Sequence, residues 1–393
     1  MKKSVIVSAV RTPVGSFMGA LSKVKAVDLG AKVVAQAVKQ GGIDKSEVEY
    51  VIMGCVLTAG LGQSPSRQVI IKSGLSEKVQ ALTINKVCGS GLKSVMIADQ
   101  MIRSGDHEVV VAGGMESMSN APYLLPGARS GLRMGNKEVV DSMINDGLWD
   151  VYNDVHMGSC ADDGATKYSI SRERQDEFAA LSYRRSQRAI ADGDFVDEIV
   201  PVEVPQRKGD PVIVDTDEGP GRVKFDKIPK LRPAFSKDGS VTAANASSIN
   251  DGAAAFLVMS QEKAESLGLQ PLATIVSHAG YSHEPKFFTT APVGAMKKLF
   301  AKTATTPEDI DLYEINEAFS FVTLHAADQF KIELDKVNVN GGSVAIGHPI
   351  GASGGRILVT LLHAMKNRKA AKGMASICIG GGEALAMLLE NNS

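Results

Sequence analysis

Two long segments of the chain repeat the same order of elements, and this repeat constrains the fold more than any other feature. The first runs from an apolar stretch at Tyr50–Met53 to a glycine-rich segment at Cys88-Gly-Ser-Gly. The second runs, at nearly equal spacing, from Leu312–Glu314 to a glycine-rich segment that begins at His348. Each then closes with an apolar run that ends in glycines, at residues 109–114 and 376–382. We therefore predict two related halves, and the cleft between them is a natural place for a site.

Short β-rich runs alternate with helix-like stretches in both halves, such as Val27–Lys39 and Gly91–Arg103. This alternation predicts an α/β fold of two pseudo-duplicated halves, with mostly parallel mixed sheets covered by helices. The expected strands are Val5–Val10, Tyr50–Met53, Leu82–Asn85, Val109–Ala112, Ala253–Val258, Ala273–His278, Leu312–Glu314, Val337–Asn340, Ser376–Ile379 and Ala384–Leu389.

The stretch from about Ser119 to Ile249 does not follow the repeat. It holds the only tryptophan, Trp149, turns rich in proline and glycine at residues 201–222, and a helix predicted over Ser171–Ala191. We therefore expect an inserted loop domain at 119–249. The N-terminal half would comprise 1–118 with 250–270, and the C-terminal half would comprise 271–393.

Composition excludes several classes of protein. Forty-three Lys and Arg against 44 Asp and Glu give a net charge of −1, which argues against nucleic acid or an anionic membrane as a partner. Four cysteines among 393 residues, with no Cys-x-x-Cys or His-x-x-x-His, indicate neither a disulfide framework nor a metal site. Unpaired thiols fit a reducing compartment. Without a signal-peptide core near the first residues or a long apolar stretch, we expect a cytoplasmic location.

Cys88 is the first candidate for chemistry. It lies between a predicted strand and a predicted helix, with Gly89-Ser-Gly91 directly after it. The positive end of the helix dipole is expected to lower the pKa of a thiol there and favour the thiolate. The alternative is an inert core cysteine. The small neighbours leave the sulfur open, so we favour a nucleophile.

Three other residues are ambiguous when taken singly. His348 is held by Pro349, and it suits either a general base or a loop histidine bonded to backbone. Cys378 ends an apolar strand, which favours a core position, although the three glycines after it offer backbone N–H groups for an oxyanion hole. Asn316 either caps a turn or orients a water or a histidine.

A rival motif occurs at Gly351-Ala-Ser353-Gly-Gly, which matches the nucleophile elbow of serine hydrolases. In that family an acidic residue and then a histidine follow the serine. Here His363 is the only histidine after Ser353, and no carboxylate lies between them. We therefore interpret Ser353 as a small residue at a helix start. Gly89-Ser-Gly91 lacks the third glycine of a dinucleotide-binding loop, and there is no Walker A pattern.

Taken together, these segments resemble the thiolase family from Val5 to Leu389. The resemblance lies in Asn85-Lys-Val-Cys88-Gly-Ser-Gly, Asn316-Glu-Ala-Phe319, the Asn340–Gly354 loop with Gly-His348-Pro, and Cys378-Ile-Gly-Gly-Gly. It implies that Cys88 attacks an acyl-CoA, that His348 takes its proton, and that Cys378 is the second acid/base. Asn316 would hold a water that stabilises an enolate with His348, and the N–H groups of Cys88 and Gly380 would bind an oxyanion.

Within the family, His156-Met157-Gly-Ser-Cys160 is similar to the biosynthetic branch, which condenses two acetyl-CoA to acetoacetyl-CoA. The resemblance implies ping-pong kinetics and no cofactor, with CoA as substrate and product. It also implies a homotetramer, with the tetramer contact in segment 119–140. The alternatives are a degradative 3-ketoacyl-CoA thiolase for longer chains and, more remotely, a serine hydrolase using Ser353.

The resemblance also supplies residues for the two ends of the substrate. Met157 and Phe288 would contact the acyl group, and Phe287-Phe288 departs from the small aliphatic and Met more common in biosynthetic relatives, which leaves the preferred chain length open. A basic set would face the CoA phosphates: Arg222, Lys224, Lys227, Lys230 and Arg232. The remaining predicted CoA contacts are Leu148, His156, Leu231, Phe235, Ala243, Ser247, Ala318 and Phe319.

Overall fold

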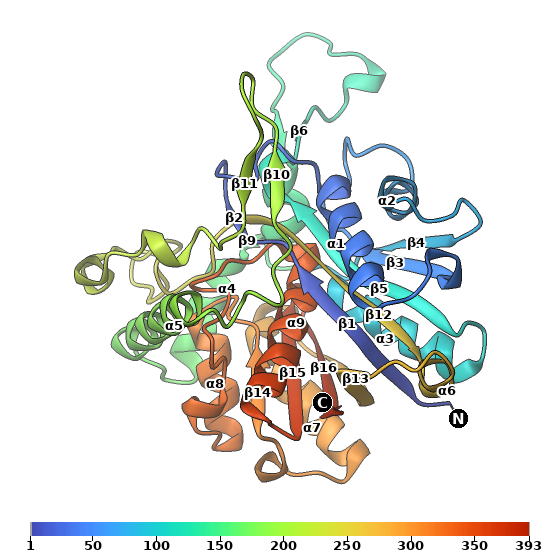
Figure 1. The fold of residues 1–393 in the computed structure, drawn as a ribbon. Coiled ribbons are helices and arrows are strands. Elements are labelled where there is room, and N and C mark those ends of the chain that lie inside the picture. The colour runs from blue at the N-terminus through green and yellow to red at the C-terminus, as the bar shows by residue number, and fades with distance from the viewer. Residues whose placement is uncertain (1, 393) are drawn as a thin grey trace.

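The computed structural model describes residues 2–392, and one mixed sheet of ten strands runs through it (Figure 1). A short strand, β2 (Gly15–Ser16), pairs with β12 beside the main order of strands. That order is β14 (Leu312–Ile315), β15 (Lys372–Ile379), β16 (Glu383–Asn391), β13 (Ala273–Ser282), β1 (Ser4–Arg11), β12 (Asn250–Ser260), β5 (Val109–Ser117), β3 (Tyr50–Gly54) and β4 (Gln80–Ile84).

The sheet contains the predicted repeat. In one half β3 is parallel to β5, and β5, β12 and β1 are antiparallel neighbours. In the other half β14, β15, β16 and β13 follow the same scheme. Even the irregularities correspond, because the register shifts between Ile6 and Ser8 in β1 and between Ile275 and Ser277 in β13. The halves meet where β1 pairs with β13 over only two residue pairs.

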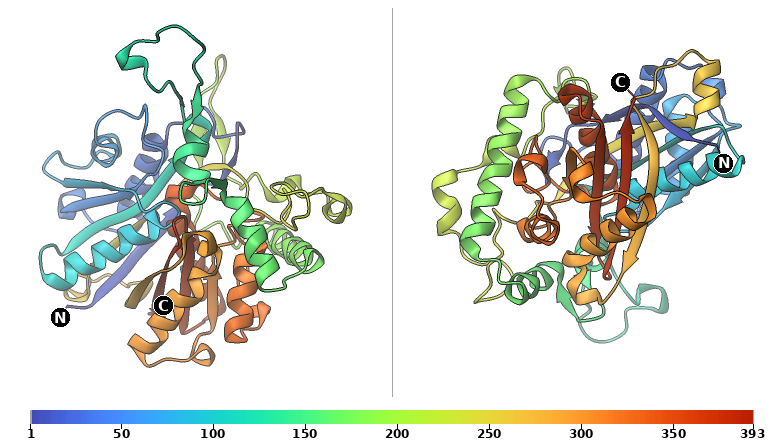
Figure 2. Two further views of the ribbon diagram at one scale, coloured as in Figure 1. Left: turned by 180° about the vertical axis from the view of Figure 1, so that it is seen from behind. Right: turned by 90° about the horizontal axis from the view of Figure 1, so that it is seen from below.

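Helices and sheet halves form five layers. Helices α1 (Ala26–Gln40) and α2 (Pro65–Ser73) cover the outer face of the N-terminal half, and α7 (Ala291–Thr303) and α8 (Ser320–Phe330) cover that of the C-terminal half. Between the halves lie α3 (Ser90–Ser104) and α9 (Ile350–Arg368) (Figure 2). The side chains of both helices pack against strands of both halves. A shorter helix, α6 (Gln261–Ser266), follows β12.

The two central helices approach each other closely because glycines lie at their contact. A Cβ on Gly91 of α3 would lie 2.6 Å from the backbone nitrogen of Gly355. A Cβ on Gly354 of α9 would lie 2.5 Å from the backbone nitrogen of Leu92. Any larger residue at either position would therefore push the helices apart. This contact brings the N-terminal ends of α3 and α9 together between the halves.

Residues 119–249 lie outside the ten-stranded sheet, and their long helix α5 (Arg172–Asp192) packs on α8. It matches the helix predicted over Ser171–Ala191, with Ser171 as its cap. The proposed division into three units stays a prediction. The other elements of this stretch are β6 (Tyr123–Leu124), β7 (Val140–Asp141), a π-helix (Ile144–Leu148), β8 (Trp149–Asp150), β9 (Val155–His156), α4 (Met157–Lys167), β10 (Val202–Val204), β11 (Val212–Val214) and 3₁₀ helices at Met118–Asn120, Ala128–Ser130, Pro220–Arg222 and Phe225–Lys230.

The α/β prediction is confirmed, with two differences in detail. The parallel pairs lie toward the two ends of the sheet, whereas the strands between them pair antiparallel. The strand expected at Val337–Asn340 is wrong, because Asn338 has a left-handed backbone with φ of 47°. Its side-chain amide instead bonds both the N–H and the C=O of Ile315, at 2.8 Å each, and so replaces a strand beside β14.

The remaining 3₁₀ helices are Lys45–Glu47, Pro285–Thr290, Pro307–Asp309 and Leu334–Lys336.

None of the helices in residues 2–392 combines the length and the hydropathy that crossing a lipid bilayer requires.

A buried ion cluster ties the insertion to the sheet. Arg11 at the end of β1 donates to Glu198 at 2.6 Å and, with two nitrogens, to Asp217 at 2.7 and 2.8 Å. All three side chains are fully buried. Glu198 also accepts from Thr360 of α9. The guanidinium therefore connects β1, two segments of the insertion and a central helix.

Replacing Arg11 should destabilise the protein strongly. In Arg11→Met, two buried carboxylates lose their cation, and breaking such a pair costs about 3–5 kcal/mol. The free energy of unfolding, measured by denaturant titration, tests this. Arg174→Met is the matched control, because Arg174 and Asp328 are 44% and 40% exposed and such a pair contributes about 0–1 kcal/mol. Equal effects of the two substitutions would contradict the role of the buried cluster.

Candidate active site

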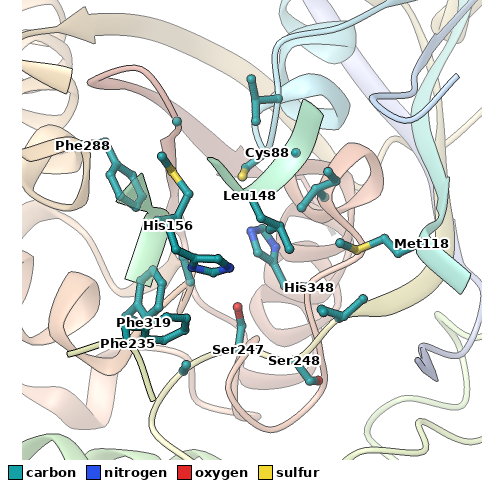
Figure 3. Close-up of a pocket in the computed structure, with 18 residues that line it drawn as sticks. Cys88, Met118, Leu148, His156, Phe235, Ser247, Ser248, Phe288, Phe319 and His348 are labelled. Atoms are coloured by element: carbon teal, nitrogen blue, oxygen red, sulfur yellow. The ribbon is translucent and has the colours of Figure 1, made fainter. Parts of the chain in front are cut away.

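A largely apolar pocket opens where the N-terminal ends of the two central helices meet (Figure 3). Its walls come from both halves and from the insertion. Cys88 and His348 face the same space in Figure 3. The lining residues are Val87, Cys88, Met118, Gly147, Leu148, His156, Met157, Phe235, Ala246, Ser247, Ser248, Ile249, Phe288, Ala318, Phe319, His348, Ile350 and Gly380.

Cys88 lies in a tight turn two residues before α3. Val87 has a φ of 46°, and the Ser90 hydroxyl donates to the Val87 carbonyl while accepting from the Lys86 N–H. The backbone N–H groups of Gly380 and of Cys88 itself lie near the sulfur and favour its thiolate form, so both lower the pKa of the thiol. The turn thus aims the thiol across the cleft at the glycines after β15.

The expectation of a lowered Cys88 pKa is wrong. Burial between the two halves raises the pKa of the thiol to about 12, and the two N–H groups only partly oppose this. The charge of nearby Glu116 raises it further. The helix-dipole argument considered only the helix that follows Cys88. Segments far along the chain remove the thiol from water, and this desolvation has the larger effect on its pKa. At neutral pH Cys88 is therefore a thiol and needs a base to become a nucleophile.

Cys378 is fully buried at the end of β15, two residues before Gly380. Burial raises the pKa of its thiol well above the usual range, and a charge on Cys88 raises it further. Gly380, two residues after Cys378, lines the same pocket as Cys88, so the two thiols belong to facing parts of one site. Cys378 forms part of the wall directly behind the pocket rather than its surface. All four cysteines, including Cys55 and Cys160, are free thiols.

His348 precedes α9 and is only 6% exposed. Its backbone N–H donates to Asn250, at 2.9 Å. Its Nδ1 lies 2.6 Å from the hydroxyl oxygen of Ser353, and Nε2 has no hydrogen-bond partner among the described residues. Burial first, and then the charge of Arg356, lowers the pKa of His348 to about 3. The imidazole is therefore neutral at physiological pH.

Asn316 follows β14, which is parallel to β15, and its N–H donates to the Ser376 carbonyl at 2.9 Å. The carboxyl ends of both strands thus place Asn316 and Cys378 in the same wall. The Asn316 side chain is buried, and its Oδ1 accepts from the Ser343 hydroxyl at 2.6 Å. Its Nδ2 has no partner among residues 2–392. Ala318, two residues on, lines the pocket.

The structure brings most of the predicted CoA contacts into this pocket. The imidazole of His156 stacks on Phe235 with centroids 4.6 Å apart, and Phe288 meets Phe319 edge to face at 6.5 Å. These aromatic rings form one end of the pocket. The predicted residues that line it are Leu148, His156, Met157, Phe235, Ser247, Phe288, Ala318 and Phe319.

Seven predicted contacts do not line the pocket, namely Leu231, Ala243 and the basic set of Arg222, Lys224, Lys227, Lys230 and Arg232. All of these except Leu231 are exposed. Arg222 forms an ion pair with Glu218, at 2.7 Å. Their contact with a ligand stays a prediction.

Sequence reasoning missed two residues near the site, Glu116 and Ser343, and the hydrogen bond of a third, Ser353. Glu116, at the end of β5, is buried and accepts from the N–H groups of Val56, Leu57 and Gly351, and burial raises its pKa to about 7. Ser343 and Ser353 bond Asn316 and His348. A charged residue ending an apolar strand was the available signal for Glu116. The serine contacts depend on how the loops fold.

The interpretation of Ser353 as merely a small residue is incomplete. Its hydroxyl donates to the Pro349 carbonyl at 2.8 Å and lies against the imidazole of His348. It is buried on α9 and does not line the pocket. The hydroxyl is thus occupied within the protein, unlike that of an exposed nucleophile elbow.

The chain is similar to known proteins over nearly its whole length. The family model described as "Thiolase, N-terminal domain" matches residues 4–262, and "Thiolase, C-terminal domain" matches residues 269–391. An acetyl-CoA acetyltransferase of Cupriavidus necator is 56% identical over 391 residues, with 99% of this chain and 100% of the relative covered. One from Pseudomonas aeruginosa is 53% identical, with 99% of each covered.

A solved structure has nearly the same fold. It is the Acat5 thiolase from Ascaris suum in complex with coenzyme A, with a TM-score of 0.95 and 44% identity. The match covers 99% of this chain and 100% of that one. Both family models, the relatives and the fold agree over essentially the full length. The chain belongs to the thiolase family.

Proposed function

We propose that the protein condenses two acetyl-CoA molecules reversibly to acetoacetyl-CoA and CoA, through a thioester on Cys88. The observation that carries this proposal is the pocket itself, where a thiol lies near two backbone N–H groups and shares the lining with a neutral imidazole that has a free nitrogen. The relatives named acetyl-CoA acetyltransferase and the CoA-bound thiolase support it. Such a reaction has two half-reactions, which gives ping-pong kinetics.

In the first half-reaction, Nε2 of His348 takes the proton of the Cys88 thiol, and the sulfur attacks the thioester carbonyl. The N–H groups of Cys88 and Gly380, which lie near the sulfur, then bind the oxyanion that forms on the attacked carbon. The carbon–sulfur bond to CoA breaks, and the proton passes from His348 to the leaving thiolate. The products are acetyl-Cys88 and CoA.

The tautomer of His348 suits this role. The Ser353 hydroxyl has one proton, and it donates that proton to the Pro349 carbonyl. Ser353 therefore accepts from Nδ1–H of His348, which leaves a lone pair on Nε2. The base is prepared before substrate binds.

In the second half-reaction, the thiolate of Cys378 removes a proton from the methyl group of a second acetyl-CoA. The raised pKa of Cys378 makes the thiol rarely ionised but its thiolate a strong base, and it equally makes the thiol a proton donor to the carbanion in reverse. Asn316 offers an unpartnered Nδ2 donor, which supports the proposal that it holds a water. That water would donate one proton toward the enolate oxygen and the other to the lone pair on Nε2 of His348. The enolate carbon then attacks acetyl-Cys88, and the bond between the acetyl carbon and the Cys88 sulfur breaks to give acetoacetyl-CoA and the Cys88 thiolate. The proton that Cys378 took passes to this thiolate, which restores the Cys88 thiol and the Cys378 thiolate.

The aromatic end of the pocket favours a short acyl group. Phe288 is 3% exposed, and Met157 and Phe319 lie beside it in the pocket. We therefore place the degradative long-chain alternative second. The engaged hydroxyl of Ser353 argues against the hydrolase alternative.

The proposal also includes a place for the phosphate groups of CoA. We place the phosphates near the exposed basic residues Arg222 and Lys230.

We also propose a cytoplasmic homotetramer with no resident cofactor. The loop around β6 projects from the molecule in Figures 1 and 2, and it exposes Leu125, Leu132, Met134 and Val139. Burial of these apolar side chains would stabilise a contact between copies.

Cysteine substitutions should separate the half-reactions. Cys88→Ala should lose acetylation and condensation, because the acyl carrier is gone, and acetyl-CoA should protect Cys88 of the unmodified protein from iodoacetamide. Cys378→Ala should still be acetylated on Cys88 but lose condensation. Intact-protein mass measurement with peptide mapping after mixing with acetyl-CoA tests both. Cys160→Ala is the control, since its sulfur lies outside the pocket. Condensation by Cys88→Ala would refute the mechanism.

Ser353→Ala should weaken the base by releasing Nδ1. We expect a fall in kcat of about 10-fold or more, part of the roughly 10²–10⁴-fold that a positioned base contributes. Nitrogen NMR of labelled histidine should show His348 of the unmodified protein neutral, with Nδ1 protonated, from about pH 5 to about pH 8. Its lowered pKa means that the proton binds only in stronger acid. Titration near the ordinary histidine pKa would contradict this.

Chain-length preference tests the acyl pocket. The four-carbon ketoacyl-CoA should be cleaved with a higher kcat/KM than the eight-carbon one. Phe288→Ala should reduce this preference about 10-fold, which corresponds to one or two methylenes of pocket space. Phe287→Ala is the control, because its ring faces Lys167 at 3.7 Å rather than the pocket. A higher kcat/KM of the unmodified enzyme for the longer chain would favour the degradative alternative.

A further inference from the structure

A buried chain of hydrogen bonds leads from α9 to Asn316. Arg356 of α9 donates through Nη2 to the Ser343 hydroxyl oxygen at 2.7 Å, and Ser343 lies 2.6 Å from Oδ1 of Asn316. None of the three side chains is more than 2% exposed. No described side chain other than Ser343 bonds the Asn316 amide.

The chemistry of these groups gives the chain one direction. A guanidinium can only donate, so the Ser343 oxygen accepts from Arg356. The single hydroxyl proton of Ser343 is then left to donate, and the Asn316 amide oxygen is the acceptor within reach. If the Asn316 amide were flipped, its Oδ1 and Nδ2 would exchange places. The hydroxyl proton of Ser343 would then lose its acceptor, and an oxygen would occupy the present position of Nδ2. A buried hydroxyl without an acceptor costs about 1–3 kcal/mol.

Arg356 is poorly matched to a purely structural role. Its closest carboxylate, Glu314, is 3.7 Å away, and Nε and Nη1 of Arg356 have no hydrogen-bond partner among the described residues. Both oxygens of Glu314 are likewise unpartnered. A buried ion pair this loose does not offset the desolvation of the cation. Its one close hydrogen bond, at 2.7 Å, goes to Ser343.

We propose that Arg356 and Ser343 are positioning residues that fix the amide of Asn316, so that its Nδ2 donates toward the enolate. Polarisation along the chain strengthens this donor, because each hydrogen bond enhances the next. The inference rests on the role proposed above for Asn316. It implies that the second half-reaction depends on the relay, whereas acetylation of Cys88 does not.

Ser343→Ala tests the relay with the least disturbance, because it removes one oxygen. We expect the condensation kcat to fall about 10- to 100-fold, as misplacement of a catalytic group does. The single-turnover rate of Cys88 acetylation by acetyl-CoA should stay within about twofold. Ser94→Ala is the matched control, since Ser94 is equally buried but donates to the Gly91 carbonyl within α3. It should change neither rate.

A double-mutant cycle shows whether Ser343 acts through Asn316. In an Asn316→Ala background, Ser343→Ala should have no further effect on condensation. A full additional loss would refute the relay while leaving the role of Asn316 intact. If Asn316→Ala itself leaves condensation unchanged, the proposed role of Asn316 fails, and the relay with it.

Arg356→Lys and Arg356→Met extend the test to the cation. Lysine keeps the positive charge and can still donate to Ser343, so it should retain more condensation activity than methionine. A parallel fall of acetylation and condensation in Ser343→Ala would show a merely structural role and overturn the proposal. Because Ser343→Ala is expected to fold, this comparison of the two rates remains decisive even if Arg356→Met does not fold.

Discussion

The close contact of α3 and α9 is the constraint on which the rest of the structure depends. Glycines at Gly91 and Gly354 let the two helix backbones approach without intervening side chains. Cys88 precedes one helix and His348 precedes the other. A tight crossing at the N-terminal ends therefore sets the distance between the thiol and the imidazole. The glycines of the second repeat, which suggested a nucleophile elbow, serve this packing.

Two serines that do not line the pocket determine which atoms of His348 and Asn316 donate hydrogen bonds and which accept them. Ser353 commits Nδ1 of His348 as a donor and leaves Nε2 basic, whereas Ser343 commits Oδ1 of Asn316 as an acceptor and leaves Nδ2 as a donor. Each serine has only one proton, and each donates it to a fixed acceptor. The two groups that the proposed mechanism assigns to the substrate are thus one acceptor and one donor before any ligand arrives.

Sequence alone predicted the α/β halves, and the motifs around Cys88, His348 and Cys378 pointed to residues that the fold brings together. These inferences succeeded because the strands and the glycine-rich segments are local features. The pKa of Cys88 was predicted in the wrong direction because segments far along the chain surround the thiol, and the desolvation that they cause outweighs the local effect of the helix. The strand at Val337–Asn340 failed for a related reason, since the Asn338 side chain takes over the pairing with β14.

The narrow junction of β1 with β13 has a consequence for biosynthesis. Because two residue pairs join the halves there, docking of the halves depends mainly on side-chain packing around the central helices. Cys88 leaves the ribosome long before His348 and Cys378. Until the second half docks, its sulfur meets water and has the acidity of an ordinary cysteine. Docking of the second half suppresses ionisation of this exposed thiol. The same docking brings in the imidazole of His348, which can take the thiol proton when substrate is bound.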